Sequence, residues 1–285
     1  MNSSTNLKYL VHLCMLSAAG AATAVPLECN DFLAANQNGE LFSVDPDMGS
    51  TSFIGTVPAT TEVEFDEITG KLYLEASNGG TELYDIDPDT AAINGYVNHP
   101  YGALNGMEYV NSTLYATFIG GPGDPSELVI VDVDTGSLTE IGRTGVGPVS
   151  GLAYDEASNT MWGVTAGGST ARLVTIDLNT GNATVVQQLL DASGHQLFKV
   201  GSIEFGADGN LYGGLTSSDP VLPDYLIKID TATGIATPLM DTGYSITGLT
   251  SGCFDKATNA RVYALGDING DGSQDIVALF RENDS

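Results

Sequence analysis

The sequence predicts an all-β fold, a β-propeller of four-stranded antiparallel blades, with five blades favoured and six left open. An apolar, β-branched run that ends in aspartate and then turns occurs five times, and its aspartates are 42, 45, 45 and 53 residues apart. Helical periodicity is almost absent, because the one candidate helix, at 186–197, is broken by Gly194. A β-sandwich is the alternative fold. The five aspartates are Asp45, Asp87, Asp132, Asp177 and Asp230.

Each repeat supplies four strand-like segments. An aromatic-rich segment comes first, then a short second strand, then the strand that ends in aspartate, then a fourth strand; turn residues such as Asp208-Gly209 separate the first two. In one repeat these segments begin at Gly151, Thr160, Leu173 and Ala183. Four short strands in a repeat of this length describe one propeller blade.

The repeated aspartate is predicted to be structural. A residue that occurs once in every blade is a poor candidate for catalysis, whereas an aspartate that opens a turn can accept hydrogen bonds from the next backbone N–H groups. The Thr-Gly pair that follows, as at Thr135-Gly136, adds a hydroxyl cap and a residue that tolerates positive φ.

The ends of the repeat region predict how the ring closes. The first repeat begins at Asp31 without an inner strand, and an unpaired inner strand, 248–255, is left after the last aspartate hairpin. If this strand completes the first blade, the ring closes and exposes no long edge. The run 254–265 also has the pattern of a hairpin, which is why six blades remain the alternative.

The order GLAYD (151–155), NLYG (210–213) and LYDIDPDTA (83–91) resembles secreted bacterial β-propeller repeats of the NHL and YVTN type. It is most similar to propellers with an LYxIDPxTG repeat. The resemblance spans about 31–255, within a propeller domain expected over 25–255, and it implies a blade architecture without implying an activity.

The N-terminal 24 residues have the features of a signal peptide. Lys8 precedes an apolar stretch, 9–16, that is too short to cross a bilayer, and Ala22-Thr23-Ala24 forms a small-residue cleavage site. We therefore expect residues 1–24 to be removed and the mature protein to be secreted or periplasmic, with no membrane insertion.

Two cysteines, Cys29 and Cys253, remain in the mature chain. They lie at opposite ends of the repeats, so in an oxidising compartment they are expected to form a disulfide that holds the ring closed. Two separate buried thiols are the alternative.

The chain is strongly acidic. Nine Lys and Arg face 36 Asp and Glu, a net charge of −27, which disfavours binding to nucleic acid or to anionic membranes. Acidity spread over a chain is typical of a soluble protein or of a salty habitat, whereas local acidity can indicate the binding of divalent cations. We expect the protein to be a monomer.

Three glutamates occupy matched positions on the expected inner strands. Aligning the strands on their aromatic residues places Glu64, Glu108 and Glu204 at one position, with Ala153 and Cys253 on the other two strands. Converging carboxylates can hold a divalent cation or work as a catalytic acid and base. Similar inner-strand carboxylates occur in five-bladed glycoside hydrolases, whose blade motifs this chain lacks. The favoured interpretation is nevertheless that the glutamates line a solvated channel mouth.

The C-terminal segment, 256–285, is expected to form a hairpin around a calcium loop. The pattern D-x-N-x-D-G-x-x-D starts at Asp267 and supplies oxygen ligands at the spacing that Ca²⁺ requires, with Gly272 at the sharp turn. An EF-hand would place a glutamate where Ala278 stands, so the loop instead resembles the calcium loops of FG-GAP and VCBS repeats. That resemblance implies four side-chain ligands and one carbonyl ligand, from Asp267, Asn269, Asp271, Asp275 and, by its carbonyl, Ser273.

No arrangement of residues for nucleophilic catalysis is recognisable in the sequence. His99, next to Pro100, is expected in a surface loop, and no Asp-His pair is signalled. The sequence thus favours a calcium-stabilised binding module that is not an enzyme and contacts an extracellular protein or glycan. A glycan-directed hydrolase that uses Glu64, Glu108 and Glu204 is the alternative.

Overall fold

The computed structural model describes residues 31–77, 79–119, 124–165 and 170–251, and the strands 260–265 and 275–280. The described residues form strands and turns without an α-helix. Accordingly, no helix in this part of the chain is long and apolar enough to span a membrane.

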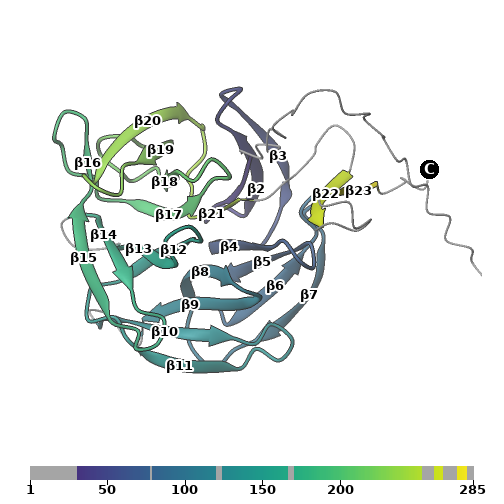
Figure 1. The fold of residues 1–285 in the computed structure, drawn as a ribbon. Helices are drawn as coiled ribbons and strands as arrows, with labels where there is room; N and C mark the ends of the chain where they lie inside the picture. The colour runs from purple at the N-terminus through teal and green to yellow at the C-terminus, as the bar shows by residue number, and fades with distance from the viewer. Residues whose placement is uncertain are drawn as a thin grey trace, which may run out of the picture.

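The structure is a five-bladed β-propeller (Figure 1). From the inside outwards, blade 1 consists of β21 (Gly248–Ser251), β1 (Phe32–Ala35), β2 (Glu40–Asp45) and β3 (Ser50–Thr56). Blade 2 consists of β4 (Thr60–Asp66), β5 (Lys71–Ala76), β6 (Glu82–Ile86) and β7 (Ile93–Asn98). Blade 3 consists of β8 (Leu104–Val110), β9 (Thr113–Ile119), β10 (Ser126–Val131) and β11 (Leu138–Arg143).

The last two blades follow the same order. Blade 4 consists of β12 (Val149–Asp155), β13 (Thr160–Thr165), β14 (Arg172–Ile176) and β15 (Ala183–Gln188). Blade 5 consists of β17 (Val200–Phe205), β18 (Leu211–Leu215), β19 (Tyr225–Ile229) and β20 (Ile235–Asp241), and β16 (Leu190–Asp191) adds a short parallel edge to β20. The five inner strands β21, β4, β8, β12 and β17 each contact the next around the ring.

The ring closes as the sequence predicts. The C-terminal strand β21 pairs antiparallel with β1, from Phe32 opposite Ser251 to Ala35 opposite Gly248. The first blade therefore combines both ends of the repeat region, and the count is five rather than six. Residues 252–255 of the predicted inner strand lie outside the described residues.

Apolar side chains fill the spaces between neighbouring blades. Phe32 and Phe42 of blade 1 pack with Tyr212 and Leu226 of blade 5 in one cluster. Similar clusters join blade 1 to blade 2, blade 2 to blade 3, blade 3 to blade 4 and blade 4 to blade 5. The core is thus a set of contacts between blades, and both faces of each blade are buried.

The structural role predicted for the repeated aspartates is confirmed. In the turn after β14, Asp177 Oδ1 accepts hydrogen bonds from the N–H groups of Asn179 and Thr180 at 2.8 and 3.2 Å. Asp87, Asp132 and Asp230 accept the same pair of bonds, and Asp45 accepts one.

The glycine that ends this turn allows the turn to approach the backbone of the neighbouring blade closely. Gly181 has a φ of 75°, and a Cβ there would lie 2.4 Å from the carbonyl oxygen of Gly142 in blade 3. Gly49 ends the turn of blade 1 with a φ of 62°, but a Cβ there would meet nothing within 4 Å.

Two strands follow the ring in sequence. β22 (Ala260–Leu265) and β23 (Asp275–Phe280) pair antiparallel with each other. Of the expected calcium loop, Asp275 is the first residue of β23, and residues 267–274 are outside the described residues. The calcium loop therefore stays a prediction.

We expect Gly181→Ala to lower the free energy of unfolding by about 1–3 kcal/mol more than Gly49→Ala does. Both variants force alanine into the left-handed region, but only the first also drives a methyl group into the backbone of the neighbouring blade. Urea denaturation of both variants measures the difference. Equal losses would show that the turn does not need to approach the next blade so closely.

Cys29 and Cys253 lie outside the described residues, three residues before β1 and two residues after β21. Since these two strands are paired, we expect the cysteines to form a disulfide. Mass spectrometry of the exported protein, alkylated with and without reductant, should show two thiols only after reduction. Alkylation of both thiols without reductant would contradict the pairing.

Candidate metal centre at the centre of the ring

Glu64, Glu108 and Glu204 occupy equivalent positions on the inner strands β4, β8 and β17. Each lies opposite a tyrosine of its blade's second strand: Tyr73, Tyr115 and Tyr212. Side chains alternate along a strand, so equal register turns equal faces of the three strands toward the ring axis.

The three carboxylates converge. One oxygen from each lies within 4.8 Å of the other two, and the residues are only 4, 7 and 6% exposed. The sequence favours glutamates at a solvated channel mouth, and this interpretation is wrong, since the three carboxylates are buried. They converge instead, as their matched positions allow.

Hydrogen bonds hold some of the carboxylate oxygens in place. Glu64 Oε1 accepts the Tyr109 N–H at 2.9 Å, and Glu204 Oε1 accepts the Ser251 hydroxyl at 3.2 Å. Glu64 Oε2 and Glu108 Oε2 are buried and have no hydrogen-bond partner. Buried charged oxygens without partners are costly, so a bound ligand or a proton must offset their desolvation.

Burial raises the pKa of all three carboxyls. The pKa of Glu64 rises to about 8, chiefly because of desolvation, although hydrogen bonds from Tyr109 and Thr250 oppose the shift. For Glu108, desolvation comes first, and repulsion from Glu204 and Glu64 raises the pKa further. The pKa of Glu204 is raised by desolvation and by the Glu64 carboxylate. Like charges close together in a dry site oppose each other's ionisation.

A fourth carboxyl, Glu62, was not singled out from the sequence. It is fully buried two residues before Glu64 on β4, and both of its oxygens accept the Ser202 hydroxyl, at 3.0 and 2.8 Å. The N–H groups of Val63 and Leu249 also donate to Glu62 Oε1. Its oxygens are thus already occupied, and burial raises its pKa. The sequence does contain a signal for it, because residues two apart on a strand lie on the same face, as Glu62 and Glu64 do on β4.

The other two inner strands carry no carboxylate at this position. Ala153 occupies it on β12, as the sequence predicts. On β21 this position is Thr250 and not Cys253. Thr250 pairs with Leu33, which pairs with Ser43, two residues before the turn aspartate. Glu64 is related in the same way to the turn aspartate of blade 2. The alignment on aromatic residues failed on this strand because β21 has a serine, Ser251, where the other inner strands have Phe or Tyr.

The carboxylate cluster fits a hard divalent cation. Its donors are all oxygens, the type that Ca²⁺ binds at about 2.3–2.6 Å, so two oxygens on opposite sides of the ion are about 4.8 Å apart. The three oxygens can therefore reach one ion of this size. A cation would also supply partners for the two buried oxygens without hydrogen bonds.

The structure corrects the expectation for His99. It lies in the interior, 4% exposed, and its Nε2 is 3.1 Å from both carboxylate oxygens of Glu75. Glu75, whose pKa is raised to about 7 by burial against the opposing effect of His99, also accepts the Leu104 N–H. No local sequence pattern signals this pair, because the partners are 24 residues apart. An exposed Asp-His pair is also present, between Asp191 and His195.

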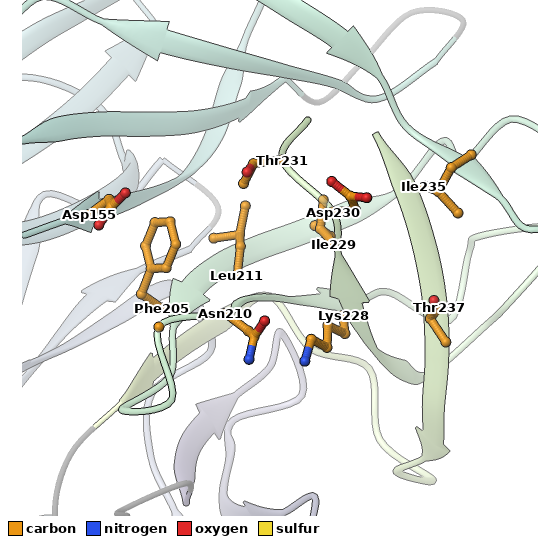
Figure 2. A pocket seen from close by; sticks show the side chains of 11 residues that line it. Asp155, Phe205, Asn210, Leu211, Lys228, Ile229, Asp230, Thr231, Ile235 and Thr237 are labelled. Atoms are coloured by element: carbon orange, nitrogen blue, oxygen red, sulfur yellow. The ribbon is translucent and has the colours of Figure 1, made fainter. Parts of the chain in front are cut away.

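Away from the axial cluster, a pocket of about 440 Å³ lies at the edge of blade 5 beside blade 4 (Figure 2). Phe205, Leu211 and Ile229 form its apolar part. Asp155 and Asp230 at its rim already accept turn N–H groups. Its carboxylates are therefore committed to the fold, and the axial cluster is the stronger candidate site.

Comparisons with known proteins add only likenesses in fold. The sequence matches no model of a known family, and no curated protein matches it. Among solved structures, a luciferin-regenerating enzyme is 12% identical over 90% of this chain and 89% of its own, with a TM-score of 0.48. A chain of a nidogen/laminin complex is 14% identical over 78% and 97%, with a TM-score of 0.46. A gluconolactonase from Xanthomonas campestris is 12% identical over 76% and 73%, with a TM-score of 0.49.

At this level of similarity, the likenesses say nothing of what the chain binds. The resemblance to NHL and YVTN repeats, and that of the C-terminal loop to FG-GAP and VCBS repeats, stay predictions.

In cation-free buffer, we expect the protein to lose stability as the pH rises from about 5 to 8. The folded pKa of Glu64 lies above its ordinary value, so the folded state holds more protons than the unfolded state in this window. For each extra proton held by the folded state, the free energy of unfolding falls by about 1.4 kcal/mol per pH unit. Urea denaturation in chelator at several pH values measures the slope.

Glu204→Gln should flatten this slope, because it removes one carboxyl and relieves its repulsion on Glu108. Glu140→Gln, on the exposed side of β11, is the matched control and should leave the slope unchanged. A wild-type stability that is constant or rises over this range would mean that the cluster ionises freely.

Proposed function

We propose that this protein is an exported, cation-organised binding module in which Glu64, Glu108 and Glu204 hold one divalent cation on the propeller axis. The observation that carries the proposal is the cluster of three buried carboxylates, two of which have an oxygen without a partner. Calcium is the proposed ion, because the donors are all oxygen and a calcium-sized sphere spans them.

Charge balance supports a bound cation. In the described residues the ion pairs of lysine and arginine involve Asp85, Glu127 and Asp208, and none involves the three axial glutamates. The cluster therefore needs either protons or a metal ion for neutralisation, and a divalent cation replaces protons at neutral pH and above.

The hydrolase alternative has less support. A glycosidase needs two carboxyl groups on either side of a sugar ring, at the floor of an open cleft. The axial carboxylates are close enough to one another, but they are 4–7% exposed, and a sugar ring cannot contact carboxylates so covered. A role for the ion in holding the ring together fits this burial better than a role in chemistry.

The second proposed calcium site is the C-terminal loop, with ligands from Asp267, Asn269, Asp271, Ser273 and Asp275. Its spacing of oxygen ligands supports this assignment. The partner of the module is proposed to be an extracellular protein or glycan, bound by the loops that join the strands at one face of the ring.

A thermal melt with calcium and with chelator tests the axial site. We expect calcium to raise the melting temperature of the wild type at pH 8, because an ion that binds only the folded form stabilises it. Glu108→Gln should remove most of this rise, since the metal loses a charged ligand and the residual pair is weaker. Glu140→Gln should keep it. An equal rise in Glu108→Gln and the wild type would contradict the axial site.

The two proposed calcium sites separate by stoichiometry. Isothermal titration of the wild type should give two calcium ions per chain, and Asp271→Ala and Glu108→Gln should each give one. The double variant should bind none. If Asp271→Ala alone removes all binding, calcium occupies the loop and the axial cluster is a site for protons only.

Calcium affinity at the axial site should fall as the pH is lowered from 8 to 6. Metal binding requires the ionised carboxylates, and the pKa of about 8 at Glu64 means that the ion must displace a proton below this pH. Titration of Asp271→Ala in two buffers of different ionisation enthalpy should show proton release at pH 7. A constant affinity without proton release would contradict a site built from these carboxyls.

A further inference from the structure

The strand that closes the ring also contacts the carboxylate cluster. β21 contributes only four residues, and two neighbouring side chains on it touch glutamates of two different blades. Thr250 Oγ1 accepts the N–H of Phe65, the neighbour of Glu64 in blade 2, at 3.1 Å, and Thr250 lowers the pKa of Glu64. The Ser251 hydroxyl donates to Glu204 of blade 5 at 3.2 Å. Figure 1 shows β21 beside β17, with β4 next to it near the centre of the ring.

Thr250 occupies the position on β21 that the glutamates occupy on their own strands. It is 2% exposed, and its Oγ1 accepts the Phe65 N–H at 3.1 Å, just as Glu64 Oε1 accepts the Tyr109 N–H one blade further on. Around the ring the equivalent positions therefore read Thr250, Glu64, Glu108, Ala153 and Glu204. Four of the five carry an oxygen.

The hydroxyl of Thr250 has one lone pair left. The hydroxyl donates its proton to the Ser251 carbonyl oxygen at 3.4 Å, and one lone pair accepts the Phe65 N–H. The second lone pair can therefore face a cation without leaving any group unsatisfied. A hard cation such as Ca²⁺ needs more oxygen ligands than three carboxylates supply, and neutral oxygens complete its coordination.

We propose that Thr250 is the fourth protein ligand of the axial cation, so that the site is complete only when β21 has closed the ring. This inference rests on the proposed cation site. It implies that a bound cation holds blade 1 to blades 2 and 5, the junction where the two ends of the repeat region meet. Blade 4, whose inner strand offers Ala153, has no direct bond to the ion.

Thr250→Val removes the hydroxyl at nearly constant volume and is the direct test. Thr117→Val is the matched control, because Thr117 is also fully buried and its hydroxyl joins two blades by donating to the Val149 carbonyl at 3.0 Å, away from the closing strand. Thr250→Ser keeps the hydroxyl and serves as the rescue variant. All are made in Asp271→Ala, so that calcium titration at pH 8 reports the axial site.

We expect Thr250→Val to weaken calcium binding by about 10- to 100-fold, and Thr117→Val and Thr250→Ser to stay within about threefold of their parent. Calcium affinity in Thr250→Val equal to that of the parent would overturn the proposal. If the parent itself binds no calcium, the axial site fails as a whole, and this outcome is distinct from a loss confined to Thr250→Val.

Hydrogen exchange provides a second measurement, which holds even if Thr250→Val folds poorly. In the Asp271→Ala parent, calcium should slow amide exchange in β1 and β21 by about tenfold or more relative to chelator, and much less in β12 and β13 of blade 4. Equal protection of all blades would overturn the coupling between the cation and ring closure, because it would mean a general stabilisation of the fold.

Discussion

Ring closure is the constraint on which the rest of the structure depends. Each blade buries both faces against its neighbours, so the first and last blades have no complete core until they meet. The pairing of β1 with β21 completes the first blade, so that β1 is paired on both sides. The same pairing brings five inner strands around one axis, and only there can residues from distant repeats lie within a few ångströms of each other.

The axial carboxylates come together only in the closed ring, and their mutual repulsion destabilises it. Glu64, Glu108 and Glu204 are desolvated by the blades around them and repel one another. Protons at low pH or a divalent cation at higher pH relieve the repulsion, so folding and metal binding are linked through the same groups. Thr250 and Ser251 extend this linkage to the strand that closes the ring.

The repeated turns solve a separate problem, which is how five similar sheets keep a fixed distance from one another. The aspartates hold each turn by accepting N–H groups, and glycines such as Gly181 allow the turn to touch the backbone of the preceding blade. The aspartate occurs in all five blades and the glycine in four, with Ala91 in its place in blade 2, whereas the axial glutamates occur in only three. Repetition therefore marks the residues that build the ring, and departures from it mark the residues that distinguish this propeller from a generic one.

The sequence by itself determined the blade architecture, the ring closure and the matched height of the three glutamates, because these follow from local alternation, turn residues and the repeat period. Tertiary structure alone decided that the carboxylates are buried, that Glu62 and Thr250 lie with them, and that His99 pairs with Glu75 in the interior. Each of these depends on contacts between blades, and no local pattern reports such contacts. The Thr250 register shows this most clearly, since an aromatic alignment placed Cys253 there and only the pairing of β21 with β1 corrected it.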